Sequence, residues 1–445
     1  MDYRFEEIQL DMMICNGIDK ILMIRTSIVI AGLVNMLLFF PSCRSIPPDP
    51  DPMDTTKSPL TLIWKNNYDS TPGIADSIYH SQNPLIYKGD IVYSIDRVKM
   101  DVKVKIVRAD GEKGTVKWQT VLPTASINSL GLLDNRVIVH SFSKTFCLNV
   151  ENGEILWMHN MSLNDECSGP AYLKILNGYA YLVASNCDAP QHTYQRLIKI
   201  DIHTGKEEEV IRFNRNYSSA RSPFISPPNS ILNKEGEQIL YFMVNWLHNS
   251  AAKIDSSIWY YAYNSTKKEM LWEKQHFEKG TEGNYSPMVW EDKVYFVGWN
   301  RVYCFDAFTG EQKWSLHMPG KSDLMGFLLT EPFLHNGVIV MKPTTRDMYG
   351  IDALSGQLIW TLKNTKCANV RYFVPYKDYF CYDCYVEDKL FMNQLSNGLE
   401  IFAYDSPNED EGGLFSKDGI AINEEKGLLY ANDGIYFMCF RINEK

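Results

Sequence analysis

The sequence predicts an all-β protein, a β-propeller of eight four-stranded blades, with seven blades as the alternative. The first observation is a pattern, Asp/Asn-x-x-x-Gly-x-x-x-Trp, that recurs with constant internal spacing, as repeat folds require. The second is the abundance of 26 Tyr, 21 Phe and 10 Trp residues, because aromatic side chains favour strands. The third is a C-terminal segment that lacks one strand of a blade, which an N-terminal segment can supply.

Residues 1–42 are predicted to form a signal-peptide region. From Met23 the chain has a positive charge, an apolar run over 27–40 and then Pro41-Ser42-Cys43, the order of a secretory signal with its cleavage site. The apolar run is shorter than the ~20 residues that cross a bilayer, which disfavours a permanent transmembrane helix. Five acidic residues before Met23 are unusual in a signal, so we expect translation to start at Met23.

Cys43 is the predicted lipidation site. A small residue directly before this cysteine, behind an apolar run, resembles a bacterial lipobox, and the resemblance implies cleavage before Cys43 and a diacylglyceryl group on its thiol. Phe40 departs from that pattern, and the alternative is an ordinary thiol. Residues 43–59 are rich in Pro and Asp and favour extended polyproline II, so we expect a lipid-anchored, semi-rigid tether.

Residues 60–445 carry the repeat. Each Asp or Asn can bond backbone amides of a tight turn, and the Gly supplies a positive φ, so together they close a hairpin. The Trp then lies on the outgoing strand, where we expect it to wedge between blades. Copies are spaced at roughly 40 to 60 residues, a typical blade length. The predicted structural residues are Asp110, Gly114 and Trp118; Asn149, Gly153 and Trp157; Asp201 and Gly205; Asp306, Gly310 and Trp314; and Asp352, Gly356 and Trp360.

Two further copies are degraded. In the first, Asn264 and Trp272 keep the spacing, but Lys268 replaces the Gly. In the second, which starts at Asp405, Glu409 stands at the Gly position and Gly413 at the Trp position. The seven turns, with one further blade split between the two chain ends, give eight blades. The interval between Asp201 and Asn264 is long, and we expect this insertion, which contains Ser226-Pro227-Pro228-Asn229, to form a surface loop on its blade.

The two ends of this region are predicted to share a blade. The segment 415–442 contains strand patterns and then stops one strand short, while Trp64 lies in a context like that of Trp157. A strand around Trp64 would complete the last blade and close the ring. Closure removes the free sheet edges that promote aggregation.

The segments around Trp118, Trp314 and Trp360 resemble the repeats of PQQ-type propellers, and the resemblance covers about residues 60–442. That superfamily includes quinoprotein dehydrogenases and non-enzymatic lipoproteins, notably the propeller subunit of the outer-membrane barrel-assembly machinery. The catalytic members carry a quinone pocket, a calcium site and an adjacent Cys-Cys pair, none of which is recognisable here. The resemblance implies a PQQ-like β-propeller without a cofactor, although the fold alone cannot select a function.

The cysteines of an exported chain raise the possibility of disulfides. Cys167 and Cys187 flank a predicted hairpin that could bring them together, and two separate buried thiols are the alternative. Cys381 and Cys384 form a lone C-x-x-C, which favours a local disulfide or unpaired thiols over a metal site, because zinc needs a second pair of ligands. No metal site is predicted.

Four tryptophans lie outside the repeat register: Trp246, Trp259, Trp290 and Trp299. Such side chains could stack on a glycan or grip a partner, and packing between blades is the alternative that we favour. The formal charge of −10 and a pI of about 5.5 provide no basic surface for phosphate backbones, so nucleic acid is not an expected partner.

These observations predict a non-enzymatic envelope lipoprotein that uses a propeller surface to bind or scaffold proteins. We expect it to be exported and anchored to the outer membrane of a Gram-negative bacterium, on a side that the sequence does not define. The alternatives are a glycan-binding propeller and a PQQ-dependent quinoprotein.

Overall fold

The structure is a computed structural model in which the described residues begin at 58. They comprise residues 58–67, 83–95, 104–124, 126–141, 144–161, 166–168, 173–186, 194–214, 221–248, 257–276, 285–298, 301–318, 331–343, 347–363, 365, 367, 370–384, 387–415 and 419–443. The predicted signal region and lipidation site therefore lie outside the described residues, as does the tether apart from residues 58 and 59.

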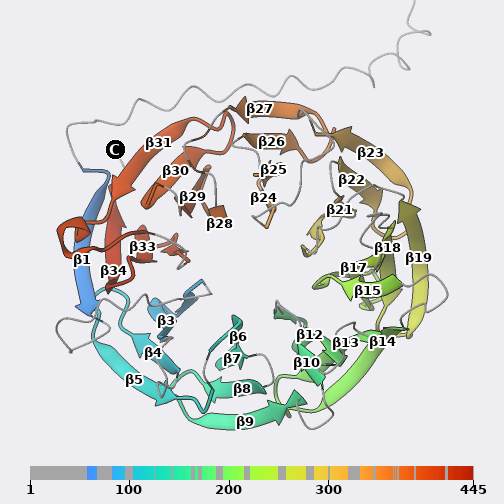
Figure 1. Cartoon of the computed structure of the whole chain (residues 1–445), viewed down its shortest axis with the longest axis horizontal. Coiled ribbons are helices and arrows are strands. Elements are labelled where there is room, and N and C mark those ends of the chain that lie inside the picture. The colour runs from blue at the N-terminus through green and yellow to red at the C-terminus, as the bar shows by residue number, and fades with distance from the viewer. Residues whose placement is uncertain are drawn as a thin grey trace, which may run out of the picture. The chain divides into compact units, whose positions relative to one another are not determined.

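Eight antiparallel sheets are arranged as blades around a common central axis (Figure 1). In chain order, the strands of the first four blades are β2 (Leu85–Tyr87), β3 (Asp90–Ile95), β4 (Lys105–Ala109) and β5 (Val116–Val121); β6 (Ser129–Leu133), β7 (Arg136–His140), β8 (Lys144–Asn149) and β9 (Ile155–Asn160); β10 (Glu166–Ser168), β11 (Lys174–Leu176), β12 (Tyr179–Asn186), β13 (Tyr194–Asp201) and β14 (Glu207–Asn214); and β15 (Arg221–Ile225), β16 (Asn229–Leu232), β17 (Gln238–His248), β18 (Ser257–Asn264) and β19 (Glu269–His276).

The remaining four blades follow the same order from the central axis outward. Their strands are β20 (Met288–Trp290), β21 (Lys293–Val297), β22 (Arg301–Asp306) and β23 (Gln312–His317); β24 (Phe333–His335), β25 (Val338–Met341), β26 (Met348–Asp352) and β27 (Leu358–Leu362); β28 (Val370–Tyr376), β29 (Tyr379–Cys384), β30 (Lys389–Gln394) and β31 (Glu400–Asp405); and β32 (Ala421–Asn423), β33 (Leu428–Asn432) and β34 (Tyr436–Ile442), with β1 (Leu60–Asn67) as the outer strand. One 3₁₀ turn, η2 (Glu409–Glu411), follows β31.

The two ends of the described chain meet in blade 8. Strand β1 pairs antiparallel with β34 over its whole length, from Leu60 opposite Ile442 to Asn67 opposite Tyr436. In Figure 1 the blue first strand lies beside the red last strands. The predictions of eight blades and of closure by an N-terminal strand are thus confirmed, and the seven-bladed alternative is wrong.

The repeat turns have the geometry that their residue types favour. In blade 1 the Oδ1 atom of Asp110 accepts hydrogen bonds from the backbone N–H groups of Glu112 and Lys113, at 3.1 and 2.9 Å. The N–H of Gly114 donates to the carbonyl oxygen of Asp110 at 2.8 Å, with φ at 69°. The turn therefore requires both an acceptor side chain at its start and a residue that tolerates positive φ.

The hydrophobic core is divided into layers between neighbouring blades. Between blades 4 and 5, for example, the fully buried rings of Tyr260 and Phe296 stack with centroids 4.6 Å apart. Alternate residues of each strand face the preceding and following blade, because side chains alternate across a sheet. Each layer therefore joins two adjacent blades into one packed ring.

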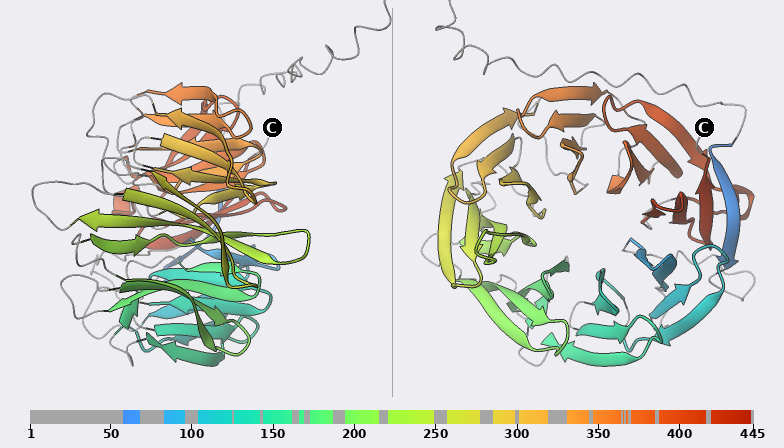
Figure 2. Two further views of the ribbon diagram at one scale, coloured as in Figure 1. Left: turned by 90° about the vertical axis from the view of Figure 1, so that its right-hand side faces the viewer. Right: turned by 180° about the vertical axis from the view of Figure 1, so that it is seen from behind.

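Blade 4, like blade 3, has a divided inner strand. Both β15 and β16 pair with β17, which at 11 residues is the longest strand of the described chain. The strands of this blade reach further along the axis of the ring than those of neighbouring blades (Figure 2, left). Ser226, Pro227 and Pro228 are buried at the bend between β15 and β16, so the predicted surface loop at this place is wrong. Prolines cannot donate to a sheet ladder, and Ser226 restores pairing by bonding Met243.

The described residues contain no helix that is long and apolar enough to span a bilayer.

Candidate functional site

Six junctions between blades share one contact, which we call the Trp–Gly dock. The tryptophan of an outer strand lies flat on the turn glycine of the next blade, and its Nε1–H donates to the backbone carbonyl of the first residue after the turn Asp, Asn or Gln. The pairs are Trp64 with Gly111 (2.9 Å), Trp118 with Val150 (2.7 Å), Trp157 with Ile202 (2.9 Å), Trp272 with Ala307 (2.9 Å), Trp314 with Ala353 (3.1 Å) and Trp360 with Leu395 (2.8 Å).

The two junctions without a dock lack both partners. Strand β14 of blade 3 has no Trp, and the turn that it faces in blade 4 has Lys268 where the other turns have Gly. Strand β31 of blade 7 has no Trp either, and blade 8 has no corresponding turn because its outer strand is β1. A Cβ at Gly356 would lie 2.5 Å from Trp314, so the indole requires the glycine.

The seventh turn lies earlier than predicted. It starts at Gln394, whose carbonyl accepts a 2.9 Å hydrogen bond from Gly398, and Trp360 packs on that glycine. Asp405 ends β31 instead, so the placement of this turn at Asp405 with Gly413 is wrong. The pattern search missed this copy because Gln394 occupies the position of Asp or Asn. Gly398, four residues later, is the sequence feature that could have identified the turn.

Small residues lie opposite five of the six docking tryptophans on the neighbouring strand, whereas Trp118 lies opposite Arg108. Cys147, Cys304 and Cys439 pair with Trp157, Trp314 and Trp64, while Ala262 and Gly350 pair with Trp272 and Trp360. Burial raises the pKa of the thiols of Cys304 and Cys439 to about 12. These buried thiols fill space under an indole and are poor nucleophiles, because the thiolate is the reactive form.

One disulfide is present among the described residues. It joins Cys367 to Cys384 in blade 7 with a Cα–Cα distance of 5.5 Å, whereas Cys381 is a buried free thiol. Of the two alternatives that the sequence left open for Cys381 and Cys384, a local bond between them is therefore excluded, because these two cysteines of β29 face different neighbours. The predicted Cys167–Cys187 disulfide lies outside what the structure describes, since only the backbone of Cys167 is placed.

The tryptophans outside the repeat register lie in packing layers. At the undocked junction of blades 3 and 4, Trp246 and Trp259 join an aromatic cluster with Phe213 and Tyr261, at centroid distances of 5.3 to 6.2 Å. Trp290 packs between blades 5 and 6, against Gly337. The structure does not bring these side chains together on one face, and Trp299 lies outside the described residues.

A buried ion cluster reinforces the junction of blades 1 and 2. The guanidinium of Arg108, 7% exposed, lies 2.6 Å from Asp90 in its own blade and 2.6 Å from Glu151 in the next. Lys117 completes the pairing of Asp90 at 2.7 Å. Hydrogen bonding by Arg108 lowers the pKa of Glu151 to about 2, with help from Tyr87 and Lys88. Arg108 thus joins blades 1 and 2 through ion pairs, and the sequence analysis did not identify it.

One ion pair joins two blades that are not neighbours in the ring. Lys174 of blade 3 lies 2.8 Å from Glu331, which precedes the inner strand of blade 6. Blades 3 and 6 are not neighbours in the ring (Figure 1). Within the described ranges, no group of three His, Cys, Asp or Glu side chains is placed to hold a metal ion.

The outer edge of the ring exposes aliphatic side chains over three consecutive blades, a surface that we call the outer arc. Its seven residues, each 37 to 52% exposed, come from β1, β5 and β9: Leu62, Ile63, Val116, Val121, Ile155, Leu156 and Met158. Strands β1, β5 and β9 are sheet edges (Figure 1). Unpaired backbone groups beside apolar side chains can accept a strand from another chain. Neither proline nor a run of lysines protects these edges.

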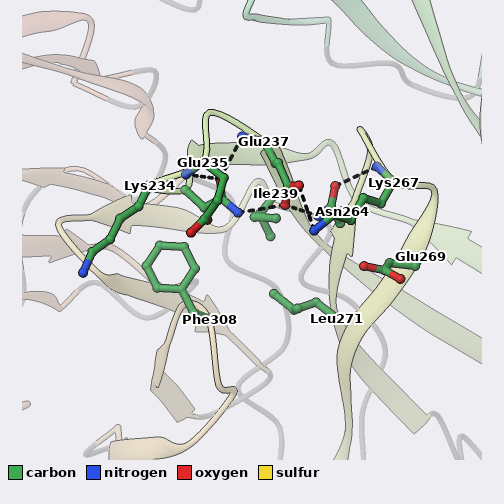
Figure 3. A pocket seen from close by; sticks show the side chains of 10 residues that line it. Lys234, Glu235, Glu237, Ile239, Asn264, Lys267, Glu269, Leu271 and Phe308 are labelled. Atoms are coloured by element: carbon green, nitrogen blue, oxygen red, sulfur yellow. Dashed lines mark hydrogen bonds and ion pairs between the residues drawn. The ribbon is translucent and has the colours of Figure 1, made fainter.

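A pocket with a cavity volume of about 310 Å³ lies at the junction of blades 4 and 5. It is formed by the β16–β17 hairpin, by the turn between β18 and β19, and by the ring of Phe308 from the next blade (Figure 3). Ile239, Leu271 and Phe308 give apolar surface, and charged side chains surround it. Sequence reasoning missed this pocket because its walls come from two blades.

The fold and the docks define the class: an eight-bladed β-propeller built from PQQ-like repeats. Residues 255–375 match the family described as outer membrane protein assembly factor BamB. The sequence matches none of the curated proteins with which it was compared.

Solved structures share the architecture at low identity. BamB from Moraxella catarrhalis is 12% identical, with 86% of this chain and 99% of that chain covered and a TM-score of 0.56. A europium-containing methanol dehydrogenase is 9% identical, with 85% of each chain covered and a TM-score of 0.62. A quinohemoprotein alcohol dehydrogenase from Pseudomonas putida HK5 is 11% identical, with 87% of this chain and 77% of that chain covered and a TM-score of 0.61. These likenesses show the fold and do not choose between binding and catalysis.

The described residues do not fit the calcium–quinone site that the resemblance implies for the dehydrogenases. Calcium takes six to eight oxygen ligands, and the described residues contain no acidic group of three that converges. The adjacent Cys-Cys pair of those enzymes has no counterpart, because Cys384 bonds to Cys367 and Cys381 stays free.

Proposed function

We propose that this chain is a non-enzymatic scaffold of the bacterial cell envelope, anchored to the outer membrane through a lipid on Cys43, that binds protein partners with the outer arc. The observation that carries the proposal is the arc itself: seven exposed aliphatic side chains along three unpaired strand edges. Apolar side chains on exposed strand edges can accept a strand from a binding partner. The likeness to BamB, a protein described as an outer membrane assembly factor, supports partners in that machinery.

The disulfide supports the export of the chain. Bonds such as Cys367–Cys384 persist in oxidising compartments and are rare in the reducing cytosol. Together with the signal pattern before Cys43, it favours an envelope location over a cytosolic one.

The lipid anchor is tested with the Cys43→Ser variant expressed from its own signal sequence. We expect the wild-type chain to incorporate labelled palmitate and to sediment with outer membranes, and the variant to lose both properties. Unchanged labelling and fractionation of the variant would show that Cys43 is not the anchor.

The binding surface is tested with a photo-crosslinking amino acid placed in the intact chain in cells. Met158 on the outer arc is the test position, and Glu209 on β14 of the next blade is a matched exposed position outside the arc. We expect discrete crosslinked protein partners from position 158, identified by mass spectrometry, and few from position 209. Equal crosslinking at the two positions, or none at position 158, would contradict the outer arc as the binding surface.

A further inference from the structure

The pocket between blades 4 and 5 has features of a specific recognition site. We propose that it receives the arginine side chain of an extended segment of a protein partner, an inference that rests on the proposed protein-binding function. The pocket lies on blades 4 and 5, outside the outer arc of blades 8, 1 and 2. It would therefore form a second point of contact with a partner.

An aromatic ring forms one wall of the pocket. Phe308 is held in place by the blade 5 turn, where its N–H donates to Asp306 at 3.1 Å. The equivalent position of the other described turns holds no Phe, Tyr or Trp, but Glu112, Glu151, His203, Thr266, Leu354 and Ser396. Phe308 is only partly buried and faces Leu271, which is 40% exposed. This surface suits the alkyl stem and planar guanidinium of an arginine, which stacks on aromatic rings.

The rim of the pocket carries two carboxylates, Glu235 and Glu269, whose charges act on Lys267 only from a distance. Among the described residues, the carboxylates of Glu235 and Glu269 form no hydrogen bond or ion pair, and both residues are exposed. In Figure 3 the side chains of Glu235 and Glu269 lie on different sides of the apolar surface, while that of Lys234 extends away from it. The unpaired charge is therefore negative, and it is complementary to a cationic side chain.

The third carboxylate of the pocket, that of Glu237, already has hydrogen-bond and ion-pair partners within the protein. Glu237 lies 2.8 Å from the ammonium of Lys267, and it accepts hydrogen bonds from the side-chain amides of Asn233 and Asn264, each at 2.9 Å. The hydrogen bond from Lys267 is the largest of the effects that lower the pKa of Glu237. These contacts hold the β16–β17 hairpin against the neighbouring turn. Glu237 thus shapes the pocket and leaves Glu235 and Glu269 for the ligand.

The size of the cavity favours one long side chain. A volume of about 310 Å³ lies at the lower end of the range for ligand sites, ~300 to 1,000 Å³. Lysine offers the charge without the planar fork and stacks less well, so we expect arginine to be preferred over lysine.

The test measures fluorescence polarisation of three labelled pentapeptides with the full chain. Each has the sequence Gly-Leu-X-Leu-Gly, where X is arginine, lysine or citrulline, the uncharged analogue of arginine. We expect the arginine peptide to bind at least tenfold more tightly than the citrulline peptide, with lysine between them, and its affinity to fall as salt is raised. Equal affinities for arginine and citrulline, or no detectable binding of any peptide, would overturn the proposal.

Variants locate the binding to this pocket. We expect E235Q/E269Q and F308A each to reduce arginine-peptide affinity at least tenfold, while E311Q, an exposed carboxylate of the same turn outside the pocket, leaves it unchanged. Unchanged melting temperatures check that the variants fold. Arginine binding that persists in E235Q/E269Q contradicts the inference, whereas crosslinking through Met158 tests the proposed function independently.

Discussion

At the scale of single residues, the Trp–Gly dock couples two positions in different blades. The indole needs a flat floor and a carbonyl to receive its N–H, and the glycine provides the floor because it has no Cβ. Where Lys268 occupies the turn, the facing strand β14 has no Trp. The repeat pattern thus reflects contacts between neighbouring blades as well as turns within each blade.

We predict that Gly356→Ala lowers the free energy of unfolding by about 2 to 4 kcal/mol, from the positive φ and the overpacking against Trp314 together. The matched control is Gly178→Ala, where φ is 87° but the space around an added Cβ is open. It should cost only about 1 to 2 kcal/mol. Urea denaturation of both variants checks this, and equal losses would mean that the indole does not rest on Gly356.

His140 gives the molecule a predicted pH dependence. This side chain is fully buried beside Thr145, at 2.9 Å, and burial lowers its pKa to about 3, with a smaller effect from His159. In the unfolded chain a histidine has a pKa of about 6.5. Between these values the unfolded state binds a proton and the folded state does not, so stability falls as the pH is lowered.

We expect the free energy of unfolding to fall by up to about 1.4 kcal/mol per pH unit below pH 6.5 on account of His140. The His140→Gln variant, which cannot titrate there, should have a flatter profile between pH 6.5 and pH 5, above the range in which most carboxylates protonate. Urea denaturation at several pH values measures both slopes, and identical slopes would contradict a neutral buried His140.

At the scale of elements, the sequence predicted the regular parts of the fold and missed those that depend on context. The strands that carry Trp118, Trp157, Trp314 and Trp360 were predictable, because the residue types of each preceding turn indicate where the strand begins. By contrast, the turn at Gln394 was missed because an amide on a longer side chain replaced the expected Asp or Asn. Such a position is recognisable only from the facing Trp360 in the preceding blade.

Candidate site residues were less predictable than strands. The segment at Ser226 was predicted to be a surface loop because its two prolines favour turns. Its burial follows from the pairing of the flanking strands with β17, which the local sequence does not indicate. The pocket and the pairing of Cys367 with Cys384 join segments whose proximity depends on the folded ring. Arg108 was overlooked because an arginine in a strand gives no sign that two carboxylates surround it.

The Cys367–Cys384 disulfide is expected to stabilise the fold measurably. It closes a segment of 17 residues, for which chain entropy predicts a contribution of about 3 kcal/mol. Cys367→Ser, Cys384→Ser and the double variant should each lose about this amount and become insensitive to reductant. Guanidinium denaturation with and without dithiothreitol measures this. Additive losses in the double variant would contradict the bond.

At the scale of the whole molecule, the proposed binding surface depends on ring closure. The outer arc crosses the seam, since Leu62 and Ile63 belong to β1 in blade 8 while Val116 belongs to β5 in blade 1. The dock of Trp64 on blade 1 also crosses it, through the 2.9 Å bond to Gly111. If β1 did not join β34, the arc would lose Leu62 and Ile63, and β34 would become the outer edge of blade 8.

The most direct test of this account is a crosslink between the chain ends. Thr61 and Arg441 are exposed partners on β1 and β34, and facing residues of antiparallel strands lie within disulfide range. After mild oxidation of the full chain, peptide mass spectrometry should find the Thr61→Cys/Arg441→Cys pair bonded within one monomer. The control pair Thr61→Cys/Tyr436→Cys, out of register, should stay reduced. Failure of the first pair to bond, or equal bonding in both, would contradict a ring closed by β1.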